Sequence, residues 1–328
     1  MTPQVTFATS FAFVDDAIVL ACARDDLADF ARETRVFQYS FSRPPHWWVT
    51  DVEYRVRSLA YFGPSTEDFD DFVALSEDGE VRYFVDGSPF VEKISGAGVN
   101  CDDWGGWGYV ADIQQIGERL YVCGYKGQVY RRNGPNDWVH ADNGLLQDPD
   151  TPTEATIALS VINGPHENAI YAAGYRHDNW LPACAFFFDG SSWKELELPP
   201  VAERIINMYI ESEERVWMCG SNGTLLLGNA TDGFKSLSTV EDNQLFTSVC
   251  KYRELIFLGS NLGLFFYDPA KPQQGIKGVA TNLTPELQDA NIVDCAGEVL
   301  WSIGPKDIAR FDGKKWERIH HPDNPKIG

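Results

Sequence analysis

Leu120-Tyr-Val-Cys-Gly124 is a short apolar run that ends at a glycine, and runs of this kind recur along the chain. Four further copies end at glycine and two weaker ones end at serine or cysteine: Ile170-Tyr-Ala-Ala-Gly174, Val216-Trp-Met-Cys-Gly220, Leu255-Ile-Phe-Leu-Gly259, Leu300-Trp-Ser-Ile-Gly304, Val73-Ala-Leu-Ser76 and Ile18-Val-Leu-Ala-Cys22. Successive copies lie 39 to 54 residues apart. Short apolar runs repeated at a period of about 40–50 residues are typical of a β-propeller, in which each repeat forms one four-stranded blade.

The last copy shows how one repeat divides into four strands. Apolar runs occupy 292–295, 299–303, 308–311 and 316–319, and the last two are joined by Asp312-Gly-Lys-Lys. Asp-Gly between apolar runs is a strong hairpin signal, because glycine adopts a positive φ without strain. We therefore predict an all-β chain that forms a single β-propeller domain (1–328) of seven four-stranded blades, located approximately at 9–50, 55–94, 109–140, 156–198, 204–238, 245–280 and 290–320.

The pattern Gly…Gly-x-aromatic…Asp-Gly…Trp, which recurs in these repeats, resembles the propeller repeats of bacterial sensor proteins. Its Asp-Gly…Trp part is clearest in Phe188-Asp-Gly-Ser-Ser-Trp193 and Phe311-Asp-Gly-Lys-Lys-Trp316. The repeats lack the strand-ending Trp-Asp dipeptide of WD-repeat proteins, the double glycine of kelch repeats and the Asp box of sialidases. The resemblance implies a blade and no particular activity.

The chain is strongly acidic, with 48 Asp and Glu against 27 Lys and Arg and a net charge of −21 over 328 residues. Such a surface repels nucleic-acid phosphates and attracts basic proteins, so we expect a protein partner and no nucleic acid. No apolar run is long enough to span a bilayer, and the amino terminus shows no basic region followed by a long apolar run. These features predict a cytoplasmic protein that does not bind membranes and that is a monomer when unbound.

No motif for catalysis or metal binding is visible in the sequence. The seven cysteines include no Cys-x-x-Cys pair, and the adjacent His320 and His321 have no third ligand nearby in the sequence. The Gly-x-Ser-x-Gly motif and a glycine-rich phosphate loop are also absent from the sequence. We therefore expect no catalytic residue, no metal, no cofactor and no enzymatic activity.

The long loops contain the candidate binding residues. In propellers generally, the loops between blades and the loops between the second and third strands of a blade emerge on one face. The long segments 24–35, 95–108, 140–155, 174–184, 238–245 and 281–291 fall in such loops. Long loops on a rigid scaffold commonly carry binding residues, and exposed Trp and Tyr beside charged groups are typical of protein-binding hot spots. The partner-binding candidates are Asp102, Asp103, Trp104, Trp107, Tyr125, Tyr175, Arg176, Asp178, Trp180, Asp148, Asp150, Glu241 and Asp242.

Two other interpretations of these residues stay open. Trp104 and Trp107 can fold back to plug the channel or to cover the edge of a blade. The carboxylates can form a solvated rim that binds nothing. Either arrangement would be structural, and sequence alone does not separate it from a binding site.

An acidic propeller with aromatic loops and without catalytic motifs is similar to the immunity proteins of secreted antibacterial toxins. This resemblance implies a non-enzymatic inhibitor that binds and neutralises a basic toxin or effector through its acidic, aromatic loop face. The alternative is a carbohydrate-active or small-molecule-binding propeller, in which Trp104, Trp107 and Trp180 at the channel funnel would stack on sugar rings. A further alternative is a scaffold subunit of a larger complex.

Overall fold

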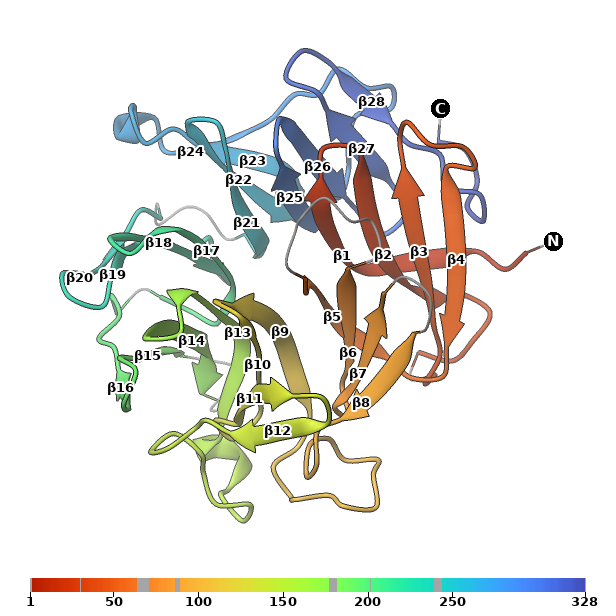
Figure 1. Cartoon of the computed structure of the whole chain (residues 1–328). Coiled ribbons are helices and arrows are strands. Elements are labelled where there is room, and N and C mark those ends of the chain that lie inside the picture. The colour runs from red at the N-terminus through yellow and green to blue at the C-terminus, as the bar shows by residue number, and fades with distance from the viewer. Residues whose placement is uncertain are drawn as a thin grey trace. The chain divides into compact units, whose positions relative to one another are not determined.

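The computed structural model describes residues 2–29, 31–63, 71–85, 89–176, 182–200, 202–238 and 244–327. These residues form 28 strands, and the helical segments among them are two short 3-10 turns, η1 (Thr153–Ala155) and η2 (Pro272–Gln274). Consecutive strands pair in groups of four into seven antiparallel sheets, which confirms the predicted all-β propeller of seven blades (Figure 1). In this described part of the chain, no helix is long and apolar enough to cross a membrane.

Each blade consists of four consecutive strands. Blade 1 contains β1 (Val5–Val14), β2 (Ala17–Arg24), β3 (Thr34–Ser40) and β4 (Trp47–Val52), and blade 2 contains β5 (Val56–Tyr61), β6 (Phe72–Ser76), β7 (Glu80–Phe84) and β8 (Phe90–Lys93). Blade 3 contains β9 (Val110–Ile116), β10 (Arg119–Gly124), β11 (Val129–Gly134) and β12 (Asp137–His140). Blade 4 contains β13 (Ile157–His166), β14 (Ala169–Arg176), β15 (Ala183–Phe188) and β16 (Trp193–Glu195). Blade 5 contains β17 (Ile205–Ser212), β18 (Arg215–Gly220), β19 (Leu225–Asn229) and β20 (Gly233–Ser236). Blade 6 contains β21 (Phe246–Tyr252), β22 (Leu255–Ser260), β23 (Gly263–Tyr267) and β24 (Ile276–Gly278). Blade 7 contains β25 (Ile292–Ala296), β26 (Val299–Ile303), β27 (Ile308–Phe311) and β28 (Trp316–Arg318).

The blades fall into two compact units. Unit 1 contains residues 2–56 and 244–327 and so holds blades 1, 6 and 7, whereas unit 2 contains residues 57–238 and holds blades 3 to 5 and all of blade 2 beyond its first residue. That the whole chain behaves as one domain stays a prediction.

The glycines that end the repeated apolar runs lie against backbone carbonyls. A Cβ atom placed on Gly174 would lie 1.9 Å from the Ala158 oxygen, and one on Gly220 would lie 2.0 Å from the Arg204 oxygen. In both blades the carbonyl belongs to the start of the first strand or to the residue just before it. The repeated glycine therefore reflects close approach of the first two strands at this point, where no side chain fits.

A buried carboxylate connects three blades of unit 2. Asp112 of β9 accepts hydrogen bonds from the Ser58 hydroxyl of β5 (2.6 Å) and from the Ile162 N–H of β13 (3.0 Å). Burial raises the pKa of Asp112 to about 6, because desolvation outweighs the hydrogen bonds that favour the ionised form. The bonds fix the first strands of blades 2, 3 and 4 to one another.

Blades 2 and 3 are also joined by a buried ion pair. The Glu92 side chain is fully buried and accepts hydrogen bonds from Arg132 Nη2 (2.6 Å), Tyr83 Oη (3.0 Å), the Asn136 N–H (3.1 Å) and Trp138 Nε1 (2.8 Å). Burial alone would raise the pKa of Glu92, but these bonds, that of Arg132 foremost, hold it below its usual value. The network satisfies a charge that would be costly if it were left alone.

We predict that Arg132→Ala lowers the free energy of unfolding by about 3–5 kcal/mol, because it leaves the Glu92 carboxylate buried without its counter-ion. Arg131→Ala is the matched control, since Arg131 is the neighbouring residue on β11 and bonds only the side chain of Asn133 at the surface (3.1 Å); we expect a loss of about 0.5 kcal/mol. Equilibrium urea denaturation of both variants measures the difference. Equal losses would show that the buried network contributes nothing particular to stability.

In unit 1 the C-terminal segment packs on the first blade. Asn324 Oδ1 accepts a hydrogen bond from the Val5 N–H (2.9 Å), and Asp323 forms an ion pair with Arg35 of β3 (3.1 Å). His321, between the end of β28 and these two residues, is buried against the blade. The last residues of the chain therefore tie blade 7 to blade 1.

His321 lies in an aromatic environment. Its ring lies 4.3 Å from that of Phe37 and 4.7 Å from that of Trp47, both edge-on, and only 6% of the residue is exposed. Burial, followed by the nearby charges of Arg35 and Lys306, lowers the pKa of His321 to about 4. The folded state therefore holds this imidazole neutral.

We predict that unit 1 loses stability when the pH falls from about 6.5 to about 4. The folded-state pKa of His321 lies below its unfolded value, so in this range the unfolded state binds more protons and acid favours unfolding. The free energy of unfolding should therefore fall by up to ~3 kcal/mol between these two pH values. His321→Gln should be less stable at pH 7 but should lose less stability on acidification. The exposed neighbour provides a control, because His320→Gln should keep the wild-type pH dependence. Parallel pH profiles for His321→Gln and the wild type, measured by urea denaturation, would contradict this role.

Candidate functional site

The loop at residues 95–108, between β8 and β9, is closed on itself by hydrogen bonds. The Gly98 N–H donates to the Gly108 carbonyl (3.1 Å), and Asp103 Oδ2 accepts from the Ser95 hydroxyl (2.8 Å) and the Gly96 N–H (3.0 Å). These bonds, that of the Ser95 hydroxyl foremost, lower the pKa of Asp103. Although Asp103 is exposed, its carboxylate shapes the loop in this structure.

Trp107 folds back from the same loop onto the segment that follows β12. Its Nε1 donates to the Gln147 carbonyl (3.1 Å), and its ring packs edge-on against His140 at 5.4 Å. A Cβ atom on Gly105 would lie 2.1 Å from the Trp107 ring, so the loop backbone passes directly over it. The half-buried Trp107 thus makes structural contacts within this part of the protein, and whether it also contacts a partner stays a prediction.

Trp104, near the tip of the loop, is oriented differently. Its side chain is 57% exposed, and the neighbouring Asp102 is exposed as well. Tryptophan is among the residues most enriched in protein-binding hot spots. Trp104 is therefore the candidate whose environment best matches that of a binding residue.

The segment at 140–155 lies beside this loop. A Cβ atom on Gly106 would lie 2.8 Å from the Pro149 side chain, and Lys126 Nζ donates to the Pro149 carbonyl. Asp148 and Asp150, on either side of that proline, are both exposed, and the Asp150 N–H donates to Asp148 Oδ1 (2.8 Å). Two predicted carboxylates thus share a surface with the loop that contains Trp104.

Tyr125 and Tyr175 meet through their hydroxyl groups, which lie 3.2 Å apart. Tyr125 is half-buried, whereas only 3% of Tyr175 is exposed, and the Arg204 guanidinium lies 4.8 Å from the Tyr175 ring centre. Burial, with the hydrogen bond to Tyr125, raises the pKa of Tyr175. The pair joins blades 3 and 4, and only Tyr125 has a sizeable exposed surface.

The other candidates lie elsewhere or are not described. Arg176 forms an ion pair with Glu195 of β16 (2.5 Å), on the outermost strand of its blade. Four candidates fall outside the described residues: Asp178, Trp180, Glu241 and Asp242.

We use the name loop cluster for the exposed or half-buried residues that the structure brings together around the 95–108 loop: Asp102, Trp104, Trp107, Tyr125, Asp148 and Asp150.

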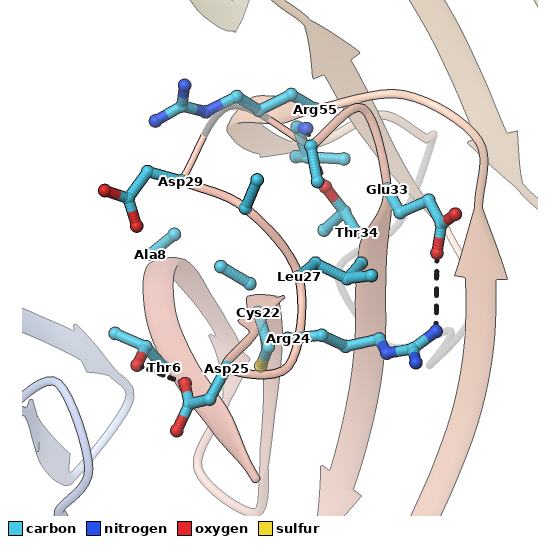
Figure 2. Close-up of a pocket in the computed structure, with 14 residues that line it drawn as sticks. Thr6, Ala8, Cys22, Arg24, Asp25, Leu27, Asp29, Glu33, Thr34 and Arg55 are labelled. Atoms are coloured by element: carbon cyan, nitrogen blue, oxygen red, sulfur yellow. Dashed lines mark hydrogen bonds and ion pairs between the residues drawn. The ribbon is translucent and has the colours of Figure 1, made fainter. Parts of the chain in front are cut away.

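Unit 1 contains a pocket that the sequence did not indicate. Its volume is about 380 Å³, and it lies beneath the loop between β2 and β3, as Figure 2 shows. Arg24 at its rim is bound by Asp26 (2.9 Å) and Glu33 (3.3 Å), while Asp25 accepts from Thr6 (2.8 Å). Arg24, Asp25 and Glu33 at the opening are therefore already paired with other side chains.

The pocket shows no catalytic arrangement. Burial raises the pKa of the Cys22 thiol at its floor well above the usual value, which makes this sulfur a poor nucleophile. No histidine lines the pocket to serve as a base. Across the described residues, no group of three or more His, Cys, Asp and Glu side chains is arranged to hold a metal ion.

The fold and the loop cluster together define a β-propeller repeat protein with an acidic, aromatic loop surface. No protein-family model matches the chain. Over 219 residues the chain is 29% identical to Immune protein Tsi7 of Pseudomonas aeruginosa, and this match covers 66% of each protein. The chain thus spans slightly less than two thirds of the length of this curated relative.

Solved structures with the same fold have diverse functions. The chain resembles the WD40 repeats of RRP9 (TM-score 0.63, 11% identity, 93% of this chain and 92% of that chain) and YCF48 bound to D1 peptide (0.61, 13%, 97% and 93%). It also resembles virginiamycin B lyase from Staphylococcus aureus (0.58, 11%, 82% and 85%). At these identities the likeness establishes the fold alone, and the fold supports both binding and catalysis.

We predict that the two tryptophans of the 95–108 loop differ in their effect on stability. Trp107→Ala removes the ring packing and the bond to Gln147 and should lower the free energy of unfolding by about 1–3 kcal/mol. Trp104→Ala removes an exposed ring and should change it by less than about 0.5 kcal/mol. Urea denaturation and limited proteolysis measure both variants. A destabilised Trp104→Ala protein would show that this ring is a structural element.

Proposed function

We propose that this protein is an immunity protein that binds and neutralises a protein toxin or effector and that has no enzymatic activity of its own. The observation that carries the proposal is the similarity to Immune protein Tsi7 over 219 residues. The net charge of −21 supports a basic partner, because complementary charge accelerates association and disfavours acidic competitors.

The loop cluster is the contact surface that we propose. Trp104 provides an exposed aromatic anchor, and the exposed carboxylates of Asp102, Asp148 and Asp150 surround it with negative charge. An aromatic anchor within a charged rim is the usual anatomy of a protein-binding hot spot. The loop cluster is therefore complementary to a partner surface that has an apolar recess bordered by Lys and Arg.

The loop cluster is held in place before a partner arrives. Trp107 is bonded to Gln147, Asp103 closes the loop and Lys126 holds the carbonyl of Pro149. A preorganised surface loses little side-chain and loop entropy on association, so more of the contact energy appears as affinity. We therefore propose that the protein inhibits the toxin by covering its active surface without a change of fold. We also propose that the protein acts in the cytoplasm and as a monomer.

The test begins with a search for a basic protein encoded next to this chain, which the immunity role predicts. Co-expression of this chain should restore growth to cells that produce that protein, and the two purified proteins should form a stoichiometric complex. Trp104→Ala should weaken the complex about 30-fold or more, equivalent to at least ~2 kcal/mol, because it removes the central anchor. Isothermal titration calorimetry or biolayer interferometry measures the affinity.

Two further measurements separate the site from the function. Trp48→Ala on β4 is the matched control, since Trp48 is a partly exposed tryptophan (36%) outside the loop cluster, and this variant should bind like the wild type. Normal binding by Trp104→Ala would remove the loop cluster from the proposal but leave the immunity role intact. Absence of both complex and growth protection would overturn the immunity role itself.

A further inference from the structure

Cys250 and Cys295 lie on the first strands of blades 6 and 7, both in unit 1. The two strands are held in register by Ser248, whose hydroxyl accepts from the Val293 N–H (2.8 Å) and donates to the Asn291 carbonyl (3.0 Å). Cys250 and Cys295 each lie two residues further along their strands, on the same sides as Ser248 and Val293, so this register places the two cysteines at the same level of the adjacent strands. Their sequence separation of 45 residues hides this proximity from any short motif.

Cys295 Sγ donates to the carbonyl of Lys251 (2.8 Å), so the Cys295 thiol reaches the strand of blade 6 at the residue next to Cys250. Cys250 is only 3% exposed, whereas Cys295 is partly exposed. The interaction with Cys250 lowers the pKa of Cys295, whereas the interaction with Cys295 together with burial raises the pKa of Cys250. The more accessible thiol is therefore also the better nucleophile.

We propose that Cys295 and Cys250 form a redox site that a small hydroperoxide converts reversibly into a disulfide between blades 6 and 7. Cys295 attacks the peroxide, so a sulfur–oxygen bond forms, the oxygen–oxygen bond breaks and water leaves when hydrogen peroxide is the oxidant. The Cys250 sulfur then attacks the sulfenic sulfur of Cys295, and a second water carries away the oxygen and the thiol proton. Two thiols are oxidised by two electrons, one peroxide is reduced, and a dithiol reverses the reaction.

The remaining five cysteines show why this pair is distinct. Cys22, Cys123, Cys184 and Cys219 are buried, and burial raises the pKa of each. Cys101 is partly exposed like Cys295, but burial and its bond to Asp103 raise its pKa. Cys101 thus serves as an internal control for simple accessibility. The proposal does not depend on the immunity role.

The test is oxidation of the full chain with low micromolar hydrogen peroxide, followed by mass spectrometry under non-reducing conditions. The wild type should lose about 2 Da, recover on treatment with dithiothreitol, and give a crosslinked peptide that contains residues 250 and 295. In Cys250→Ser the sulfenic acid cannot be resolved, so dimedone should label Cys295. In Cys295→Ser, Cys250 should stay unlabelled and no disulfide should form.

Controls make a negative result decisive. Cys101→Ser should oxidise like the wild type, and circular dichroism with thermal melts shows whether the serine variants are folded. Because residues 250 and 295 belong to different blades, the disulfide should raise the Tm of the oxidised wild type reversibly and leave that of Cys250→Ser unchanged. Labelling of Cys101 in preference to Cys295, or a folded wild type that resists peroxide without any crosslink, would overturn the proposal.

Discussion

The buried polar groups at the junctions between blades constrain everything else in this protein. A single four-stranded blade cannot bury both of its faces, so it gains stability only by packing against the next blade. Asp112 in unit 2 and Asp294 in unit 1 each accept a hydrogen bond from the first strand of a neighbouring blade, at 3.0 Å from Ile162 and 2.7 Å from Ala12. Such bonds fix the register of adjacent blades, because a slipped strand would leave the carboxyl group buried without a partner.

The repeat could be predicted from the sequence because it is set by local chemistry. Gly174 and Gly220 are required where two strands of the same blade approach within the space of one methyl group. Five of the seven apolar runs end at a glycine, so the sequence shows a readable period. The contacts between blades produce no repeated pattern in the sequence. The pairing of Glu92 with Arg132 spans 40 residues, and the burial of His321 depends on rings of blade 1 at the other end of the chain. Tertiary packing determines which of these residues meet, and a single sequence does not show that packing.

The candidate site was predictable to a similar degree. Loop length and composition pointed to the 95–108 loop, but they could not distinguish Trp104 from Trp107, two tryptophans three residues apart. The difference arises from a single long-range contact, the bond of Trp107 to the carbonyl of Gln147, together with the glycine that lets the backbone cross its ring. The same contact that partly buries Trp107 holds the loop in the conformation that exposes Trp104. The exposure of Trp104 and the partial burial of Trp107 are thus two consequences of one arrangement.

Function on this fold is decided by what the loops present. Related architectures include a lyase and a peptide-bound protein, so the blades by themselves favour neither catalysis nor binding. In the pocket of unit 1, Arg24 is already bound by Asp26 and Glu33, and the Cys22 thiol is held neutral by burial. In the loop cluster, by contrast, the Trp104 ring is exposed before any partner arrives. The exposed Trp104 ring and the net charge of −21 are the features from which we propose recognition of a basic partner, because the fold alone supports binding and catalysis equally.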